Sequence, residues 1–264
     1  MPLALGFSVD ALLPKARGGG QLRMGLVRLS EGEWLQPDPD LPARAAAFDE
    51  WPEGVQLAPA VDAPARELAT LLGLEGGLRE AARARHEDMC LLTKSDGDEQ
   101  YRLVGAAVAW PSDWLPEHKI GLSLGAVHAP IDGYAEQLAQ GVDHFMERLP
   151  AGPIYGRSNW FIAATPERRW LRDPAAANPF AHVTAENAGD TLYVRCERQT
   201  LRRLPQTGAI LFTIGVYVEP LGALDAANVR RLAQAVETLA EGEGDRRGAP
   251  AYGQVLIGFA DRRI

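Results

Sequence analysis

The fold is decided by the stretch Arg195-Cys-Glu-Arg-Gln-Thr-Leu-Arg-Arg-Leu-Pro205, which is followed after Gln-Thr-Gly by Ala209-Ile-Leu-Phe-Thr-Ile-Gly-Val-Tyr-Val218. Residues 191–199 alternate between side chains of two kinds, which is typical of a half-buried strand. Residues 209–218 are apolar at both odd and even positions, so we expect a strand that is covered on both faces. The two segments together predict a sheet at the centre of the protein.

The alternation also predicts where the arginines of this stretch point. It places Leu192, Val194 and Cys196 on one face and Tyr193, Arg195 and Glu197 on the other. Arg198 falls on the apolar face and would point inward, where a guanidinium without a partner costs several kcal/mol. We therefore expect Arg198 to meet an anion, and Glu197 points the wrong way to supply it. The alternative is a surface strand edge that carries charged side chains.

The rest of the chain predicts further strands and helices around this pair. Strands are expected near residues 24–29, 101–110, 121–127 and 154–163, and helices at 62–72, 78–86, from Asp132 to Leu149 and after the N-cap Asp225. A strand-rich middle with helices at its flanks, and no regular βαβ alternation, indicates an α+β protein with an antiparallel sheet. We expect one domain over residues 23–264, preceded by an irregular lead-in over residues 1–22.

Composition narrows the classes of function. The 264 residues carry a formal charge of −8, which argues against nucleic-acid and membrane-surface binding. The N-terminal residues do not resemble a secretory signal, and no apolar run is long enough to span a bilayer. Cys90 and Cys196 are the two cysteines, too few for a disulfide scaffold, so we expect a cytoplasmic protein.

His128 is the histidine with the most suggestive position. It follows the apolar segment 121–127, expected to be a strand, and precedes a sharp turn into the helix that begins at Asp132. One interpretation is a core histidine bonded to a backbone carbonyl, because one histidine makes no metal cluster. A single axial histidine is nevertheless all that a heme needs from the protein. Because no Cys-x-x-Cys-His occurs, covalent attachment of a c-type heme is excluded.

Several segments, taken in order, resemble the heme-dependent oxidative N-demethylase family. The matching strings are Glu87-Asp-Met-Cys-Leu-Leu92, Leu103-Val-Gly-Ala-Ala-Val-Ala-Trp-Pro-Ser-Asp-Trp114, Lys119-Ile-Gly-Leu122, Val127-His-Ala-Pro-Ile-Asp-Gly-Tyr134, Arg157-Ser-Asn-Trp160, Glu197-Arg-Gln-Thr-Leu-Arg-Arg-Leu-Pro205 and Thr207-Gly-Ala-Ile-Leu-Phe-Thr-Ile214. The resemblance extends over residues 23–240. The strings around His128 and Glu197 are long enough to be specific.

The resemblance implies a PAS-like fold, in which an antiparallel sheet and flanking helices enclose a heme b. Members of the family that resemble this chain use O₂ to oxidise a small methylated amine, which releases the demethylated amine and formaldehyde. They take electrons from a flavin and iron–sulfur reductase partner. By motif match His128 would be the axial ligand of the iron, and Arg198 and Glu197 would be catalytic. The resemblance leaves open whether Arg198 contacts the substrate, the oxygen or a heme propionate. The other positions implied to bind the cofactor are Lys119, Tyr134, Arg157, Asn159, Arg202 and Arg203.

Two departures from the family pattern leave alternatives open. Asp132-Gly133 stands where the family has Pro-Gly, which is a minor change at a helix cap. Residues 165–190 contain no string that aligns, so the identity of the amine is undetermined. The main alternative to an enzyme is a PAS-type heme sensor or carrier without turnover. A structural subunit that has lost its heme is a third possibility.

Overall fold

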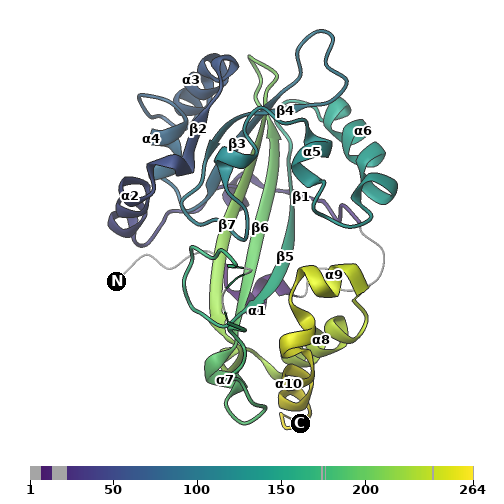
Figure 1. Ribbon diagram of the computed structural model, residues 1–264. Helices are drawn as coiled ribbons and strands as arrows, with labels where there is room; N and C mark the ends of the chain where they lie inside the picture. The colour runs from purple at the N-terminus through teal and green to yellow at the C-terminus, as the bar shows by residue number, and fades with distance from the viewer. Residues whose placement is uncertain (1–6, 14–22, 174, 176, 240, 264) are drawn as a thin grey trace.

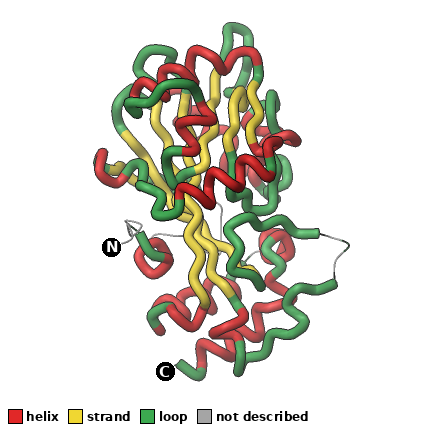
Figure 2. Tube along the Cα trace, turned by 90° about the vertical axis from the view of Figure 1, so that its left-hand side faces the viewer, coloured by secondary structure: helices red, strands yellow, loops and turns green. Residues whose placement is uncertain are grey.

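The computed structural model describes residues 7–13, 23–173, 175, 177–239 and 241–263. One long twisted sheet runs through the molecule, with helices on both sides of its upper part and a second group of helices at its lower end (Figure 1). Viewed from the side, long strands cross a waist between a wider upper part and a narrower lower part (Figure 2). The ends of these strands therefore belong to different helical surroundings.

The sheet has seven strands in the order β1-β5-β6-β7-β3-β4-β2, and every pairing between them is antiparallel. This confirms the α+β class and the antiparallel sheet. The bounds are β1 Val27–Leu29, β2 Val55–Leu57, β3 Asp88–Thr93, β4 Arg102–Ala107, β5 Ile154–Ala163, β6 Tyr193–Arg203 and β7 Ile210–Pro220.

The helices form groups around the sheet. Those before β3 are α1 Val9–Leu12, α2 Leu41–Glu50, α3 Asp62–Leu71 and α4 Leu78–Arg83, and those between β4 and β5 are α5 Leu124–His128, the π-helical turn η6 Ala135–Ala139 and α6 Gln140–Arg148. The remaining helices are α7 Ala188–Thr191, α8 Ala226–Glu237, α9 Glu241–Arg246 and α10 Ala249–Asp261. No helix in the described part of the chain is both long and apolar enough to cross a membrane.

Three clusters of buried apolar side chains make up the core. One packs α2, α3 and α4 against the upper sheet, and a second packs α5 and α6 against it. The third lies in the narrower lower part, where Trp160 and Tyr217 pack with residues of α1, α8 and α10. Strand β7 contributes buried side chains to all three clusters, which explains why residues 209–218 are apolar at both odd and even positions.

The expected strand over residues 121–127 is wrong, because the chain turns at Gly121 (φ 79°) and then forms helix α5. Ser123 caps this helix, since its hydroxyl accepts from the backbone N–H of Ala126. The alternating leucines that suggested a strand have different surroundings, with Leu122 exposed and Leu124 buried. His128 is therefore the last residue of a short helix, not the end of a strand.

Other differences lie near the termini. Helix α1 falls within the segment that we expected to be irregular, and its Val9 and Leu12 are buried against the lower sheet. The helix after Asp225 begins as predicted, but it is not the last one, because α10 follows it. Residues 242–248, which are glycines and charged residues, include most of α9 and lead into the apolar helix α10.

Arg195 holds the long connection after β5 onto the sheet. Its buried guanidinium donates to Ser112 Oγ (2.7 Å) and to carbonyl oxygens of residues 110 and 111 on one segment and residues 167 and 168 on the other. Burial lowers the pKa of Arg195 to about 10, although Glu197 and Asp88 offset part of this effect. Because the planar fork bonds several carbonyls at once, a lysine cannot replace it.

We expect Arg195→Lys to lower the free energy of unfolding by about 2–4 kcal/mol, because several buried carbonyls lose their donors. Denaturant titration followed by tryptophan fluorescence measures this change. Arg28→Lys on exposed strand β1 is the matched control and should change stability by less than about 0.5 kcal/mol. Equal effects of the two substitutions would show that Arg195 does not hold the connection.

Candidate functional site

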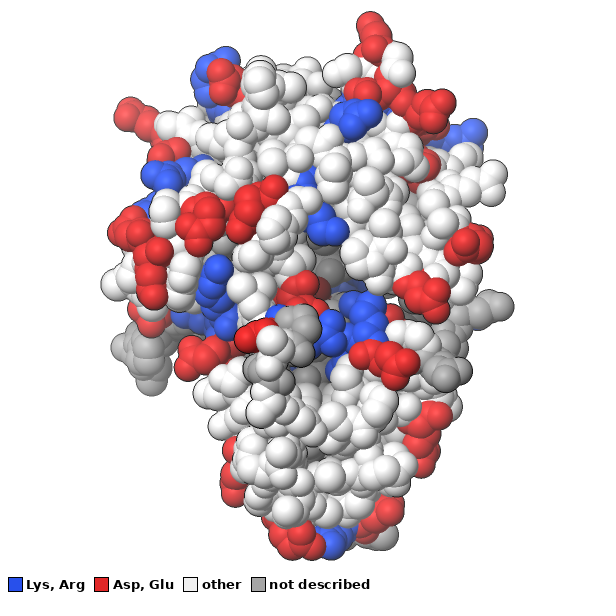
Figure 3. Space-filling view, viewed as in Figure 1, with Lys and Arg blue, Asp and Glu red and all other residues white. Residues whose placement is uncertain are grey.

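The candidate site lies on one face of the β5–β6 ribbon, between α5 and α9. Antiparallel pairing sets Arg157 opposite Gln199 and Asn159 opposite Glu197, so these four side chains share a face. The molecular surface is hollowed at the waist, where Lys and Arg side chains gather at the rim (Figure 3). Arg157, Asn159 and Gln199 are each partly exposed on this face of the ribbon.

His128 presents one ring nitrogen for ligation. Its Nδ1 lies 2.9 Å from the carbonyl oxygen of Leu124, one turn back in α5. A carbonyl can only accept, so Nδ1 carries the hydrogen and the lone pair is on Nε2, which has no hydrogen-bond partner among the described residues. Burial lowers the pKa of His128, and the charges of Arg157 and Lys119 add to this effect against the opposing bond from Leu124. The ring is thus kept neutral, as a metal ligand must be.

Tyr134 and Lys119 complete the surroundings of this imidazole. The Tyr134 ring stacks on that of His128, with centroids 4.5 Å apart and planes inclined by 13°. Lys119 Nζ donates to the carbonyl oxygen of Val127 (2.8 Å), and burial lowers its pKa. The structure therefore brings together three residues that the sequence analysis singled out separately.

Arg157 is the unpaired cation of the site. Its guanidinium has no hydrogen bond or ion pair within the described chain, although the side chain is half-buried. Burial lowers its pKa, Glu197 opposes this effect, and Arg247 adds to it. A half-buried guanidinium that makes no ion pair within the described residues is suited to an anionic ligand.

Glu197 and Asn159 lie next to Arg157 on the same face. Gln199 Nε2 donates to Glu197 Oε2 (2.9 Å), and Oε1 has no partner within the described residues. Asn159 Oδ1 accepts from Arg247 Nη2 (3.1 Å), and the same arginine donates to the Trp160 carbonyl. The buried Glu197 is thus left with one oxygen for a cationic partner.

Arg198, Arg202 and Arg203 do not join this group. Arg198 points to the opposite face of β6, where it bonds the carbonyl oxygens of Glu33 and Trp34 and lies over the Phe7 ring. It is buried as expected, but backbone carbonyls take the place of the expected anion. Arg202 pairs with Glu31 and stacks on the Trp34 ring.

Arg203 is used to join loops. It donates to the carbonyl oxygens of Leu149 (2.6 Å), Met146 and Gly208 (2.6 Å) and to Tyr101 Oη (2.8 Å). All of its donor nitrogens are therefore engaged within the protein. Such a side chain stabilises the C-terminal end of α6 and the β6–β7 turn, where four of its N–H groups are used.

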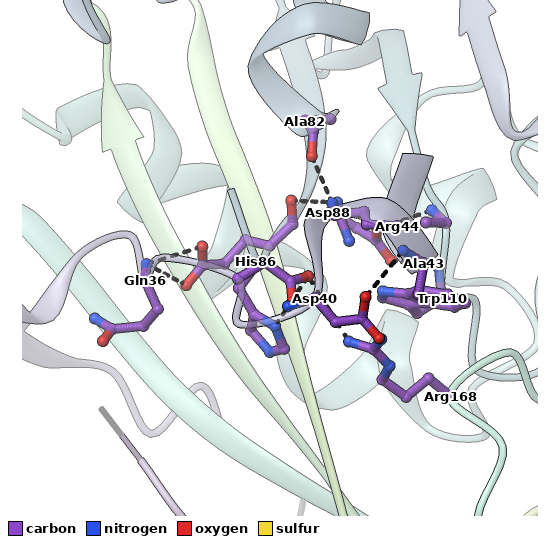
Figure 4. A network of polar contacts seen from close by, with 12 residues as sticks. Gln36, Asp40, Ala43, Arg44, Ala82, His86, Asp88, Trp110 and Arg168 are labelled. Atoms are coloured by element: carbon purple, nitrogen blue, oxygen red, sulfur yellow. Dashed lines mark hydrogen bonds and ion pairs between the residues drawn. The ribbon is translucent and has the colours of Figure 1, made fainter. Parts of the chain in front are cut away.

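A second polar network lies beside the start of β3 (Figure 4). Arg44 donates to Asp88 Oδ1 (2.9 Å), and the same carboxylate accepts from the backbone N–H groups of residues 109 and 110. His86 is fully buried, and its Nδ1 lies 3.7 Å from Asp38 Oδ2. Arg168 Nη1 lies 3.7 Å from the same oxygen. These contacts hold loops against the edge of β7.

Sequence reasoning missed Arg247 and Gln199 as members of the site. Gln199 is adjacent to Arg198, and its parity on β6, shared with Glu197, was the signal that could have identified it. Arg247 has no such signal, because it follows α9 and reaches Asn159 across 88 positions of sequence. Only the tertiary fold brings it to the sheet.

The donor set fits a heme better than a bare metal ion. Among the described residues, no group of three or more His, Cys, Asp and Glu side chains could hold a metal ion. A heme requires one axial nitrogen and cations for its two propionates, and His128 Nε2, Arg157 and Lys119 offer these groups. The fit rests on the lone pair of Nε2 and on the unpaired guanidinium.

The sequence of the whole region can be placed in a known family. The family model described as "Haem-dependent oxidative N-demethylase, alpha subunit-like" matches residues 65–257. The match includes α5, the three long strands and α9, and so every residue of the candidate site. The chain therefore belongs to the haem-dependent oxidative N-demethylase alpha subunit-like family.

Proposed function

We propose that this protein is a heme-dependent oxidoreductase that uses O₂ to remove a methyl group, as formaldehyde, from a small methylated amine. The observation that carries the proposal is that His128 Nε2 has no hydrogen-bond partner among the described residues and that the charge of Arg157 acts on the same imidazole. Membership of the family supplies the reaction class. The proposed fold is PAS-like, with the cofactor, a heme b, between the sheet and α5.

His128 would hold the iron through Nε2, because its Nδ1–H is already bonded to Leu124. Arg157 and Lys119 would pair with the propionates, since neither cation has a carboxylate within ion-pairing distance in the described chain. When bound, the heme supplies an O₂-binding iron and the redox chemistry that oxidises the amine. The protein supplies the neutral imidazole and the positive charges that fix the orientation of the macrocycle.

Glu197 would bind the ammonium group of the substrate. It is buried on the face that carries Arg157, and Gln199 fixes one carboxylate oxygen while the other has no partner. A carboxylate in a partly dry site pairs strongly with a small cation, and this contact would place the methyl group for oxidation. Asn159, held by Arg247, would line the same wall. Arg198 lies on the other face of β6. We propose that it positions this strand through its bonds to the loop that contains Trp34.

The reaction needs electrons from elsewhere. The family description names an alpha subunit, which supports a partner subunit, and we propose a flavin and iron–sulfur reductase in that role. Cys90 and Cys196 are both buried free thiols. Their state agrees with the reducing cytoplasm in which we propose that the protein works.

The first test concerns the proposed ligand. His128→Ala removes the nitrogen donor, so we expect the heme Soret band to disappear or to shift, with heme affinity reduced by at least about tenfold. Absorbance titration of the purified protein with hemin measures both quantities. His144→Ala, an exposed histidine on α6, is the control and should leave both unchanged. An unaltered Soret band in the His128 variant would contradict the assignment.

The second test concerns the substrate. Glu197→Gln keeps the shape of the side chain and removes its charge, so KM for the amine should rise about ten- to hundredfold, the equivalent of one charged hydrogen bond. Formaldehyde release with a reductase and a panel of methylated amines measures this effect. Glu99→Gln, at an exposed position, is the control. A heme-loaded wild-type protein that releases no formaldehyde with any amine would favour a sensor or carrier.

A further inference from the structure

The turn between α5 and η6 folds one aromatic side chain back onto His128. The backbone N–H of Ile131 bonds to the His128 carbonyl (2.9 Å), and that of Tyr134 bonds to the Ile131 carbonyl (3.1 Å). Gly133 lies between them with φ +72°, a conformation that side-chain-bearing residues rarely adopt. The conformation of this turn therefore places the Tyr134 ring against the imidazole of His128.

Two contacts then restrict the imidazole from different directions. The hydrogen bond from Nδ1 to Leu124 fixes the edge of the ring, and the stacked Tyr134 ring restricts its rotation out of plane. Tyr134 is only 5% exposed, so its own ring is held by the surrounding core. The hydroxyl of Tyr134 has no hydrogen-bond partner among the described residues, which leaves the ring as the part that contacts His128.

We propose that Tyr134 is a positioning residue that sets the plane of the His128 imidazole. This inference rests on the proposed function, because the plane of an axial ligand has a consequence only when His128 binds the iron. The orientation of the imidazole plane determines its overlap with the iron orbitals, and outer contacts of this kind tune affinity and ligand basicity. The proposal assigns the effect to the aromatic ring and not to the hydroxyl.

Tyr134→Leu and Tyr134→Phe form a matched pair that separates ring from hydroxyl. In the heme-free protein, stacking shifts the His128 ring protons upfield, and NMR should show this shift kept in the Phe variant and lost in the Leu variant. In the heme-loaded protein, the Leu variant should alter the ferric EPR g-values and raise the heme dissociation rate about tenfold. The Phe variant should match the wild type in both measurements.

The two readouts keep this inference distinct from the proposed function. Unchanged His128 shifts in the Leu variant, or unchanged g-values and dissociation rate, would overturn the positioning role even if the enzyme is active. A wild-type protein that never binds heme would overturn the proposed function, while the heme-free NMR result would still decide whether Tyr134 orients the ring. Gly133→Ala offers a second variant should Tyr134→Leu fail to fold, because it keeps the Tyr134 side chain but strains the turn that places its ring on His128. It too should change the His128 shifts.

Discussion

The structure depends on the two-residue period of side chains along β6. Antiparallel pairing with β5 and β7 fixes the register of this strand over its whole length, and neighbouring residues must then point to opposite faces. Glu197 consequently faces α5 and α9, whereas Arg198 faces the loop that contains Trp34. A slip of one residue would exchange the two side chains and remove the carboxylate from the neighbourhood of Arg157. Register, more than composition, defines the candidate site.

The same period explains why four arginines in one short segment have unrelated roles. Arg195 and Arg203 lie on the face that carries Glu197, but they donate hydrogen bonds to backbone carbonyls of neighbouring loops. Arg198 and Arg202 lie on the other face, where each stacks on an aromatic ring. An acidic chain therefore tolerates this concentration of cations because carbonyl dipoles and ring faces solvate them. The cation left for a ligand, Arg157, comes from the adjacent strand.

Local patterns predicted much of the fold. The alternation at 191–199, the apolar run at 209–218 and the N-cap Asp225 each identified an element correctly, because strand period and capping act over a few residues. The strand predicted at 121–127 is wrong. Its leucines alternate as in a strand, but Ser123 caps a helix that begins at Leu124. The pairing of Asn159 with Arg247 was beyond sequence reasoning, because it is made by tertiary packing. The roles of His128, Glu197 and their neighbours stay predictions.

The guanidinium of Arg157, which makes no ion pair within the described residues, has a consequence for the stability of the folded protein. An anion that neutralises it binds the folded state and not the unfolded state, so occupancy is coupled to folding by mass action. If such an anion binds, the melting temperature of the protein rises with the concentration of that anion. Newly made chains without the anion would then be the less stable population, and proteolysis would remove them first.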